Sequence, residues 1–201
     1  MVQGGIGSSA QRCARSAPPR TPSAGAYARV VAGSEGVESA RALLRDAARR
    51  LENAGAPDDV VAELVPATRR FGIPRAARLR PLGRVWRLGV LLLAADGTVR
   101  ATGGVTRAVP PGHPGHMALS TEERREVRAA AFRGFPQGTT VWFDSPVLDL
   151  YALDGTGPLL LRDGRVVVRW SISAPDDAAR DLGPYLQERV GLVLDPPLGA
   201  T

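Results

Sequence analysis

Side chains that act as nucleophiles, bases or metal ligands are scarce in this chain. It has no lysine, a single cysteine at Cys13 and two histidines, His113 and His116. The absence of lysine excludes a Schiff-base mechanism, a Ser-x-x-Lys acylation site and a phosphate-binding Gly-x-x-x-x-Gly-Lys-Ser/Thr loop. Cys13 lies in a stretch too poor in apolar residues to bury and activate its thiol. The sequence therefore favours a protein that works by contact, and no catalytic residue is assigned.

The two histidines have the spacing of a metal-ligand pair. His113 and His116 lie on one expected loop, and Asp144 or Glu122 is a candidate for the third ligand of a zinc site. The other interpretation is a surface loop rich in proline and glycine. We favour the surface loop because the pair is not on a helix and the remaining ligand must come from a distant segment.

Three aspartates recur every five residues, at Asp144, Asp149 and Asp154. That spacing does not place them on one face of a strand, and the serine, proline and glycine beside them are typical of turns. We therefore interpret them as turn residues rather than acid-base groups. The neighbouring Gly155-Thr-Gly157-Pro lacks the third glycine of a dinucleotide-binding fingerprint, so no cofactor is expected.

The strongest charge feature is a run of seven arginines between Glu63 and Asp96 with no acid among them. If Arg78 and Arg80 share a strand face, they can hold a phosphate or carboxylate bidentately, and a tryptophan nearby can stack a base. The other interpretation is a solvated face whose arginines pair with the acids of residues 122–126. The candidate binding residues are Arg75, Arg78, Arg80, Arg87 and Trp86.

The net charge of +6 is concentrated near the N-terminus. Four of the 26 arginines precede the first acid, Glu35, which leaves 22 arginines against 20 acids in the rest of the chain. This distribution weakens a nucleic-acid interpretation. A single cysteine excludes an intramolecular disulfide, and no apolar run approaches the roughly 18 residues of a membrane span. We expect no membrane partner and a cytoplasmic location.

The chain divides into an N-terminal extension and one domain. Residues 1–33 are rich in glycine, serine and proline, and we expect them to be disordered or to result from a reading frame that starts too far upstream. Residues 34–197 are expected to form a single α+β domain. Ser34 is the expected N-cap of its first helix, whose inward stripe is Val37, Ala40, Leu44, Ala47 and Leu51.

The remaining elements are read from periodicity and turn chemistry. A short helical stretch is predicted over 58–65, a charged helix over 120–133 and a terminal helix from Pro184. Period-two patterns predict a hairpin over 84–107 and a strand at 141–143. A second hairpin is predicted over 159–170. The Asp-Gly turns at residues 96–97 and 163–164 close the two hairpins. The fold class is therefore an antiparallel sheet packed against N-terminal, middle and C-terminal helices.

Several short stretches resemble a group of uncharacterised proteins from GC-rich bacteria, over about residues 60 to 195. The stretches are residues 70–78, 86–93, 131–135, 157–159, 168–171 and 185–189, which include Arg70-Phe-Gly-Ile-Pro-Arg75, Trp86-Arg-Leu-Gly-Val90 and Val168-Arg-Trp-Ser171. Some members of the group carry the label glutaminase. Serine-dependent glutaminases need Ser-x-x-Lys, and amidotransferase-type glutaminases need a cysteine nucleophile. Neither requirement is met, so the resemblance transfers no catalytic residue.

Two functions follow from these observations as expectations. The first is a small binding or interaction domain whose arginine region contacts an anionic ligand, a nucleic acid or an acidic protein surface. The second is a glutaminase-like amide hydrolase that would activate water either with carboxylates or with a metal held by His113 and His116. Pairing of hairpin edges with a partner or another copy is a third, open possibility, and the oligomeric state is not predicted.

Overall fold

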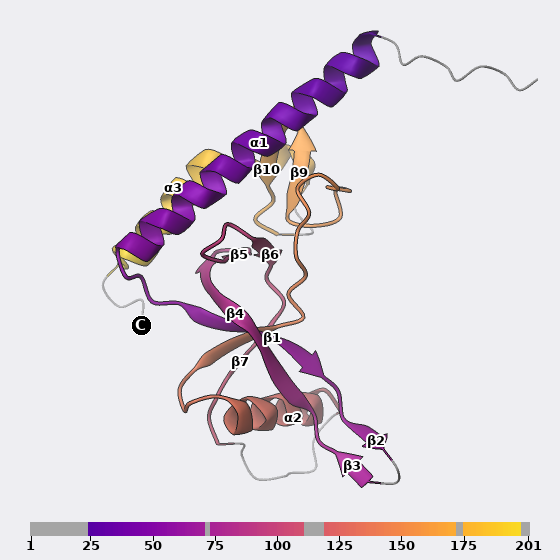
Figure 1. Cartoon of the computed structure of the whole chain (residues 1–201), viewed down its shortest axis with the longest axis vertical. Coiled ribbons are helices and arrows are strands. Elements are labelled where there is room, and N and C mark those ends of the chain that lie inside the picture. The colour runs from indigo at the N-terminus through magenta and orange to yellow at the C-terminus, as the bar shows by residue number, and fades with distance from the viewer. Residues whose placement is uncertain (1–23, 71–72, 111–118, 172–174, 198–201) are drawn as a thin grey trace, which may run out of the picture.

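A computed structural model describes residues 24–70, 73–110, 119–171 and 175–197, and it has an α+β fold (Figure 1). Cys13, His113 and His116 lie outside the described residues. The helices are α1 (Ala24–Asn53), α2 (Leu119–Gly134) and α3 (Leu182–Leu194), with a 3-10 turn at Asp176–Ala178. The strands are β1 (Asp59–Val65), β2 (Thr68–Arg70), β3 (Ile73–Arg75), β4 (Arg78–Leu88), β5 (Leu91–Leu93), β6 (Val99–Ala101), β7 (Gly104–Arg107), β8 (Thr140–Phe143), β9 (Leu159–Arg162), β10 (Arg165–Val168) and β11 (Arg180–Asp181).

The largest sheet has six strands in the order β6-β5-β4-β1-β8-β7. Its strand pairs are antiparallel except for β1 and β8, which run parallel in the register Val60 to Val141. The sheet is therefore mixed, which corrects the expectation of a purely antiparallel one. The parallel pair arises because the long connection from β1 to β8 passes through the β4–β7 strands and α2 before the chain returns. A three-stranded sheet, β11-β10-β9, and the β2-β3 hairpin complete the strands.

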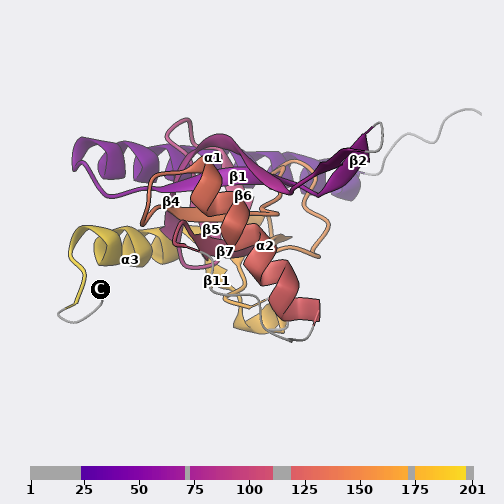
Figure 2. The same cartoon turned by 90° about the horizontal axis from the view of Figure 1, so that it is seen from below.

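The helices are divided between two ends of the molecule. Helices α1 and α3 lie side by side at one end, and α2 packs across the sheet at the other (Figures 1 and 2). The first end holds the larger core, which joins both helices to β4, β5, β9 and β10. The second holds a smaller core between α2 and strands β1, β4 and β8. None of the helices in the described ranges is long and apolar enough to cross a membrane.

Strand β4 belongs to both cores. Its C-terminal half places Trp86 and Leu88 in the core beneath α1 and α3, and its N-terminal half places Leu79 in the core beneath α2. A bulge separates the halves: Val61 pairs with Gly83, whereas Ala62 pairs with Pro81, so Leu82 has no partner on β1. Such a bulge bends and twists the strand locally, which directs its two ends toward different helices.

The first helix begins earlier than its cap signal indicated. It starts at Ala24, so Ser34 lies inside the helix and the expected boundary after residue 33 falls within α1. The predicted stripe from Val37 to Leu51 is buried, because residues three and four apart share one helix face. Gly55, at φ +60°, ends the helix as its backbone N–H bonds to the Glu52 carbonyl.

Residues 59–65 form strand β1, not the short helix that their apolar spacing suggested. A run with Val60 and Val61 fits either pattern, and β-branched side chains pack well in strands. Strand pairing decides in favour of a strand, because β1 lies between β4 and β8 in the sheet, and both neighbours are distant in sequence. Tertiary contacts therefore override the local pattern here.

The expected strand through residues 84–93 is broken by a turn at Gly89. This glycine has φ +64°, and the chain reverses from β4 into β5. The Tyr185 hydroxyl of α3 clamps the turn, because it donates to the Leu88 carbonyl at 2.8 Å and accepts from the Val90 N–H at 3.0 Å. The turn is thus attached directly to the C-terminal helix.

Residues 84–107, which were predicted to form one hairpin, contain two chain reversals. Their last strand, β7, lies elsewhere in the sheet. Strands β5 and β6 pair across a turn in which the Gly97 N–H donates to the Ala94 carbonyl, with Gly97 at φ +86°. Strand β7 leaves this hairpin and pairs with β8 at the opposite edge of the sheet. Strands β9 and β10 are joined by the two residues Asp163 and Gly164, both at positive φ.

We predict that Gly89→Ala destabilises the protein much more than Gly55→Ala. Both glycines have left-handed backbones, so alanine at either position costs about 1 to 2 kcal/mol of backbone strain. A Cβ at Gly55 meets nothing, whereas a Cβ at Gly89 overlaps the Tyr185 hydroxyl and adds roughly 1 to 3 kcal/mol of overpacking. Urea unfolding of the two variants measures the difference, and equal losses would contradict the tyrosine clamp.

Candidate functional site

The arginines of β4 are largely engaged by neighbours on the sheet. Arg80 forms a salt bridge with Glu63, and Arg84 forms a two-pronged one with Asp58, with Nε to Oδ2 at 2.6 Å. Arg87 lies over the Trp142 ring, 5.4 Å from its centroid. The acidic partners come from β1 and its approach, and not from residues 122–126 as the solvated-face interpretation supposed. Because these three side chains already have partners on the sheet, they stabilise its surface and are less available to bind an anion.

Three other arginines of the run have no such neighbours. Arg69, Arg75 and Arg78 are exposed, and none is within ion-pair distance of an acid among the residues that the structure describes. Arg78 and Arg80 do share a strand face, with the buried Leu79 pointing the other way. The exposed arginines therefore surround the β2–β3 hairpin and the start of β4.

Trp86 is not available for base stacking. Only 7% of it is exposed, and its Nε1 donates to the Ala56 carbonyl at 3.1 Å. It packs in the core under α1 and α3, on the far side of the β4 bulge from Arg78. The structure therefore removes Trp86 from the candidate binding residues and does not bring the five of them together as one site.

The aspartates at residues 149 and 154 hold turns. Asp149 accepts the Tyr151 backbone N–H, and Asp154 accepts the backbone N–H and the hydroxyl of Thr156. The hydrogen bonds from Thr156 lower the pKa of Asp154 below the ordinary aspartate value. Within the described ranges, no three His, Cys, Asp or Glu side chains are grouped to hold a metal ion. The proposed zinc ligands His113 and His116 lie outside those ranges.

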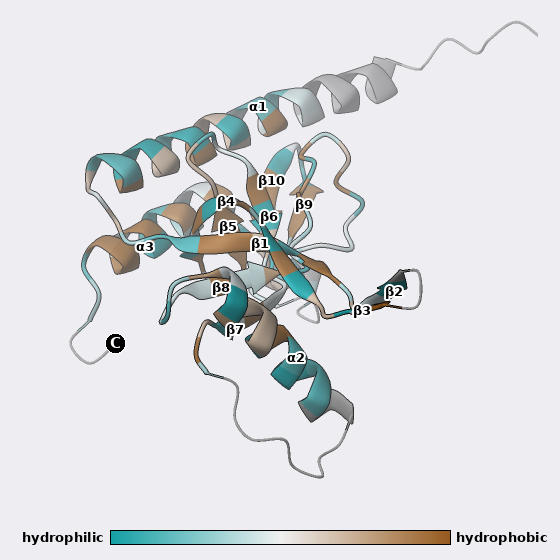
Figure 3. Ribbon diagram, turned by 60° about the horizontal axis from the view of Figure 1, so that its bottom comes forward, coloured by the Kyte–Doolittle hydropathy of each residue, from teal (hydrophilic) through white to brown (hydrophobic). Residues whose placement is uncertain are grey.

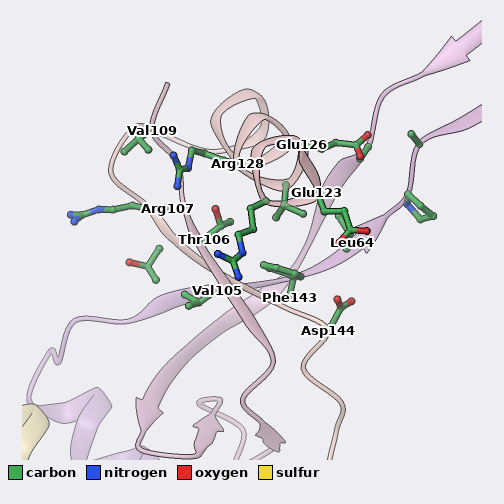
Figure 4. Close-up of a pocket in the computed structure, with 16 residues that line it drawn as sticks. Leu64, Val105, Thr106, Arg107, Val109, Glu123, Glu126, Arg128, Phe143 and Asp144 are labelled. Carbon is green, nitrogen blue, oxygen red and sulfur yellow. The ribbon is translucent and has the colours of Figure 1, made fainter. Parts of the chain in front are cut away.

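A groove of about 680 Å³ lies between α2 and strands β1, β7 and β8, and we call it the α2 groove (Figure 4). Its floor is apolar and its rim is charged. The floor includes Leu64, Val105, Val127 and Phe143, and the rim includes Arg107, Arg124, Arg128, Glu123, Glu126 and Asp144.

Each wall of the α2 groove is fixed by a different element. Helix α2 is mostly hydrophilic and contacts the core through a narrow stripe, Val127, Ala130 and Ala131 (Figure 3). Its other faces remain open, so its charged residues reach the groove. Strand β7 contributes Val105, which is 53% exposed, and Arg107, whose Nε donates to the Gly138 carbonyl at 3.0 Å.

The chain after β8 supplies the third wall. Asp144 has φ +51°, a left-handed conformation that aspartate tolerates better than most residues. The backbone at Phe143 and Asp144 lies so close to Gly103 that any Cβ there would overlap both carbonyl oxygens. A glycine is therefore needed where β7 begins, and this close approach holds Asp144 beside the start of that strand.

The charged groups on the rim differ electrostatically from those elsewhere on α2. Glu122 pairs with Arg125 one turn away, and the hydrogen bonds from that guanidinium lower the pKa of Glu122. Within the described chain, the carboxylates of Glu123, Glu126 and Asp144 accept no hydrogen bond and form no ion pair. These three carboxylates can therefore pair with a ligand without first breaking contacts within the described chain.

Sequence reasoning missed the α2 groove because five separated segments form it. The one local signal was a helix with arginines four apart, Arg124 and Arg128, on one face. That signal does not distinguish a ligand-facing surface from a solvated one. Nothing in residues 104–107 alone showed that this strand would cross the sheet and pair with β8.

Comparisons with protein-family models, with curated proteins and with solved structures found no match to this chain. The resemblance to short proteins of GC-rich bacteria and the cytoplasmic location stay predictions. The fold and the α2 groove therefore carry the functional argument.

We predict that the Asp58–Arg84 pair makes stability depend on acid. The Arg84 hydrogen bonds lower the pKa of Asp58 from its ordinary 3.8 in the folded protein. The unfolded chain then binds the proton more tightly, so the stabilisation is complete above pH 4 and lost as pH falls through the lowered pKa. A double-mutant cycle with Asp58→Asn and Arg84→Gln should show a coupling free energy that is smaller at pH 2 than at pH 7. A coupling that is the same at both pH values would contradict this origin.

Proposed function

We propose that this protein is a binding domain that holds a partly apolar, charged ligand in the α2 groove without covalent chemistry. The exposed arginines Arg69, Arg75 and Arg78 form an adjacent surface for anionic groups. One observation carries the proposal: Glu123, Glu126 and Asp144, which have no hydrogen-bond or ion-pair partner in the described chain, line a groove with an apolar floor. Sites for small molecules and peptides commonly combine an apolar wall with a few convergent polar groups, and 680 Å³ lies within their usual volume.

The arginine surface and the α2 groove adjoin each other. Pro66 and Ala67 precede β2, Ala77 follows β3, and all three line the groove. The β2–β3 hairpin that bears Arg69 and Arg75 therefore starts and ends at the groove wall. This arrangement supports an anionic group on the ligand, since guanidinium groups bind carboxylates and phosphates well.

The hydrolase alternative gains nothing from the described residues. Its water-activating ligands, His113 and His116, fall outside them, and so does Cys13. No geometry in the remaining chain supports amide hydrolysis in preference to binding. We therefore pursue the binding proposal alone.

We predict that the dye 1-anilinonaphthalene-8-sulfonate, which has an apolar body and one anion, binds in the α2 groove of the native protein. Replacing the half-exposed Val105 by serine removes apolar contact and should weaken binding about fivefold. Arg124→Gln together with Arg128→Gln should weaken it further and reduce its sensitivity to salt. Fluorescence titration measures each affinity.

The matched control is Val147→Ser. Val147 is 54% exposed, almost the same as Val105, but it lines a different groove beside α1. Its replacement should leave dye binding unchanged. Weakening by Val147→Ser, with no effect of Val105→Ser, would place the dye elsewhere and overturn the proposal. Urea unfolding of both variants separates lost binding from lost stability.

A further inference from the structure

Strand β7 is an open edge of the six-stranded sheet. It pairs with β8 on one side, and no strand in the described chain pairs with its other side. The Ala108 N–H donates to the Thr139 carbonyl, which directs the backbone of residue 108 toward β8. Because antiparallel strands alternate, the N–H groups of Val105 and Arg107 are directed away from β8. An edge of this kind can hydrogen-bond an additional extended chain.

The charges of the α2 groove change sign along β7. Gly104 pairs with Phe143, so Asp144 lies near the start of β7, and Arg107 ends the strand. Figure 4 shows Glu123, Glu126 and Asp144 on one side of the groove and Arg107 and Arg128 on the other. Apart from Arg124, which also lines the groove, the charges therefore divide into an acidic end and a basic end.

Apolar surface occupies the middle of the groove. The Val105 side chain and the Phe143 ring lie between the two charged ends (Figure 4). Val105 is 53% exposed, so it presents half of its surface to an occupant. A strand added beside β7 would place alternate side chains on this apolar surface.

We propose that the α2 groove binds an extended peptide segment that lies antiparallel to β7 and carries opposite charges at its two ends. The acidic residue lies at the end of β7 near Arg107 and Arg128 and the basic residue at the end near Asp144, with their side chains on opposite faces of the added strand because five positions separate them. The four residues of β7 span about 13 Å, so four peptide residues cover the strand and one charged residue extends beyond each end. The proposal rests on the α2 groove being the binding site.

Two features favour a peptide over other anions. A nucleic acid would place phosphates against the three carboxylates of the acidic end, which costs repulsion. A small ion would not use the row of N–H groups of Val105 and Arg107, which are directed away from β8 and have no partner in the described ranges. A peptide can form hydrogen bonds to the edge of β7 through its backbone. It can also carry charges of opposite sign at its two ends, which match the two ends of the groove.

The test uses a capped, fluorescein-labelled hexapeptide, Glu-Thr-Val-Thr-Val-Lys, and fluorescence anisotropy with the full-length protein. Antiparallel addition puts its glutamate near Arg107 and its lysine near Asp144. We compare it with forms whose ends are both Glu, both Lys or both Gln. The bipolar peptide should bind most tightly, and added salt should reduce its advantage. Equal or tighter binding by a single-sign peptide would overturn the proposed polarity.

Variants of the protein identify the two ends. Arg107→Gln and Asp144→Asn should each weaken the bipolar peptide about two- to fivefold and leave the neutral peptide unchanged. Asparagine tolerates the left-handed backbone of residue 144, so that fold should be kept. Arg165→Gln, at the exposed first residue of β10, is the matched control and should change nothing. Equal losses in the control would contradict the assignment.

Backbone methylation separates strand addition from binding of a charged small molecule. In this register the two threonines lie opposite Arg107 and Val105, so a peptide N-methylated at its two threonines loses the N–H groups that pair with β7 and should bind at least tenfold more weakly. Unchanged affinity would overturn strand addition. If the peptides fail while the naphthalene dye still depends on Val105, the binding site stands and the peptide inference falls. If both fail, the proposed function fails as well.

Discussion

The structure depends on one strand being shared by two cores. Leu79 of β4 is buried beneath α2, and Trp86 and Leu88 of the same strand are buried beneath α1 and α3. Leu79 and Trp86 are seven residues apart and would lie on opposite faces of a regular strand, whereas the extra residue at the Leu82 bulge places both on one face of a bent strand. The sheet thereby joins two helix groups that have few contacts with each other. Its six strands are the frame on which every candidate site is built.

The two ends of this frame are packed unequally. The α1 and α3 end buries long apolar side chains such as Leu44, Leu51 and Leu88, whereas α2 contributes mainly Val127, Ala130 and Ala131. Small side chains on a charged helix fill less space, so a groove remains between α2 and the edge of the sheet. The weakly packed end is thus where ligand contact costs the least stability.

Local signals predicted the parts of the fold that are locally determined. The α1 stripe from Val37 to Leu51 and the Asp163-Gly164 turn follow from helix periodicity and from turn chemistry. The β1 strand was misread because Val60 and Val61 fit two patterns, and only pairing with β4 and β8 decides between them. The α2 groove was invisible for the same reason: Asp144 and Arg107 become neighbours of one cavity through strand pairing, which no local pattern encodes.

Amide hydrogen exchange with the bipolar peptide tests the account most directly. Val105 and Arg107 lie on the edge that a ligand in the α2 groove must contact, so their amide exchange should slow when the peptide is added. Amides of the groove beside α1, such as Gly97 and Thr98, should keep their rates. Unchanged exchange at Val105 and Arg107, with new protection at Gly97 or on the β2–β3 hairpin, would contradict the assignment of the α2 groove as the binding site.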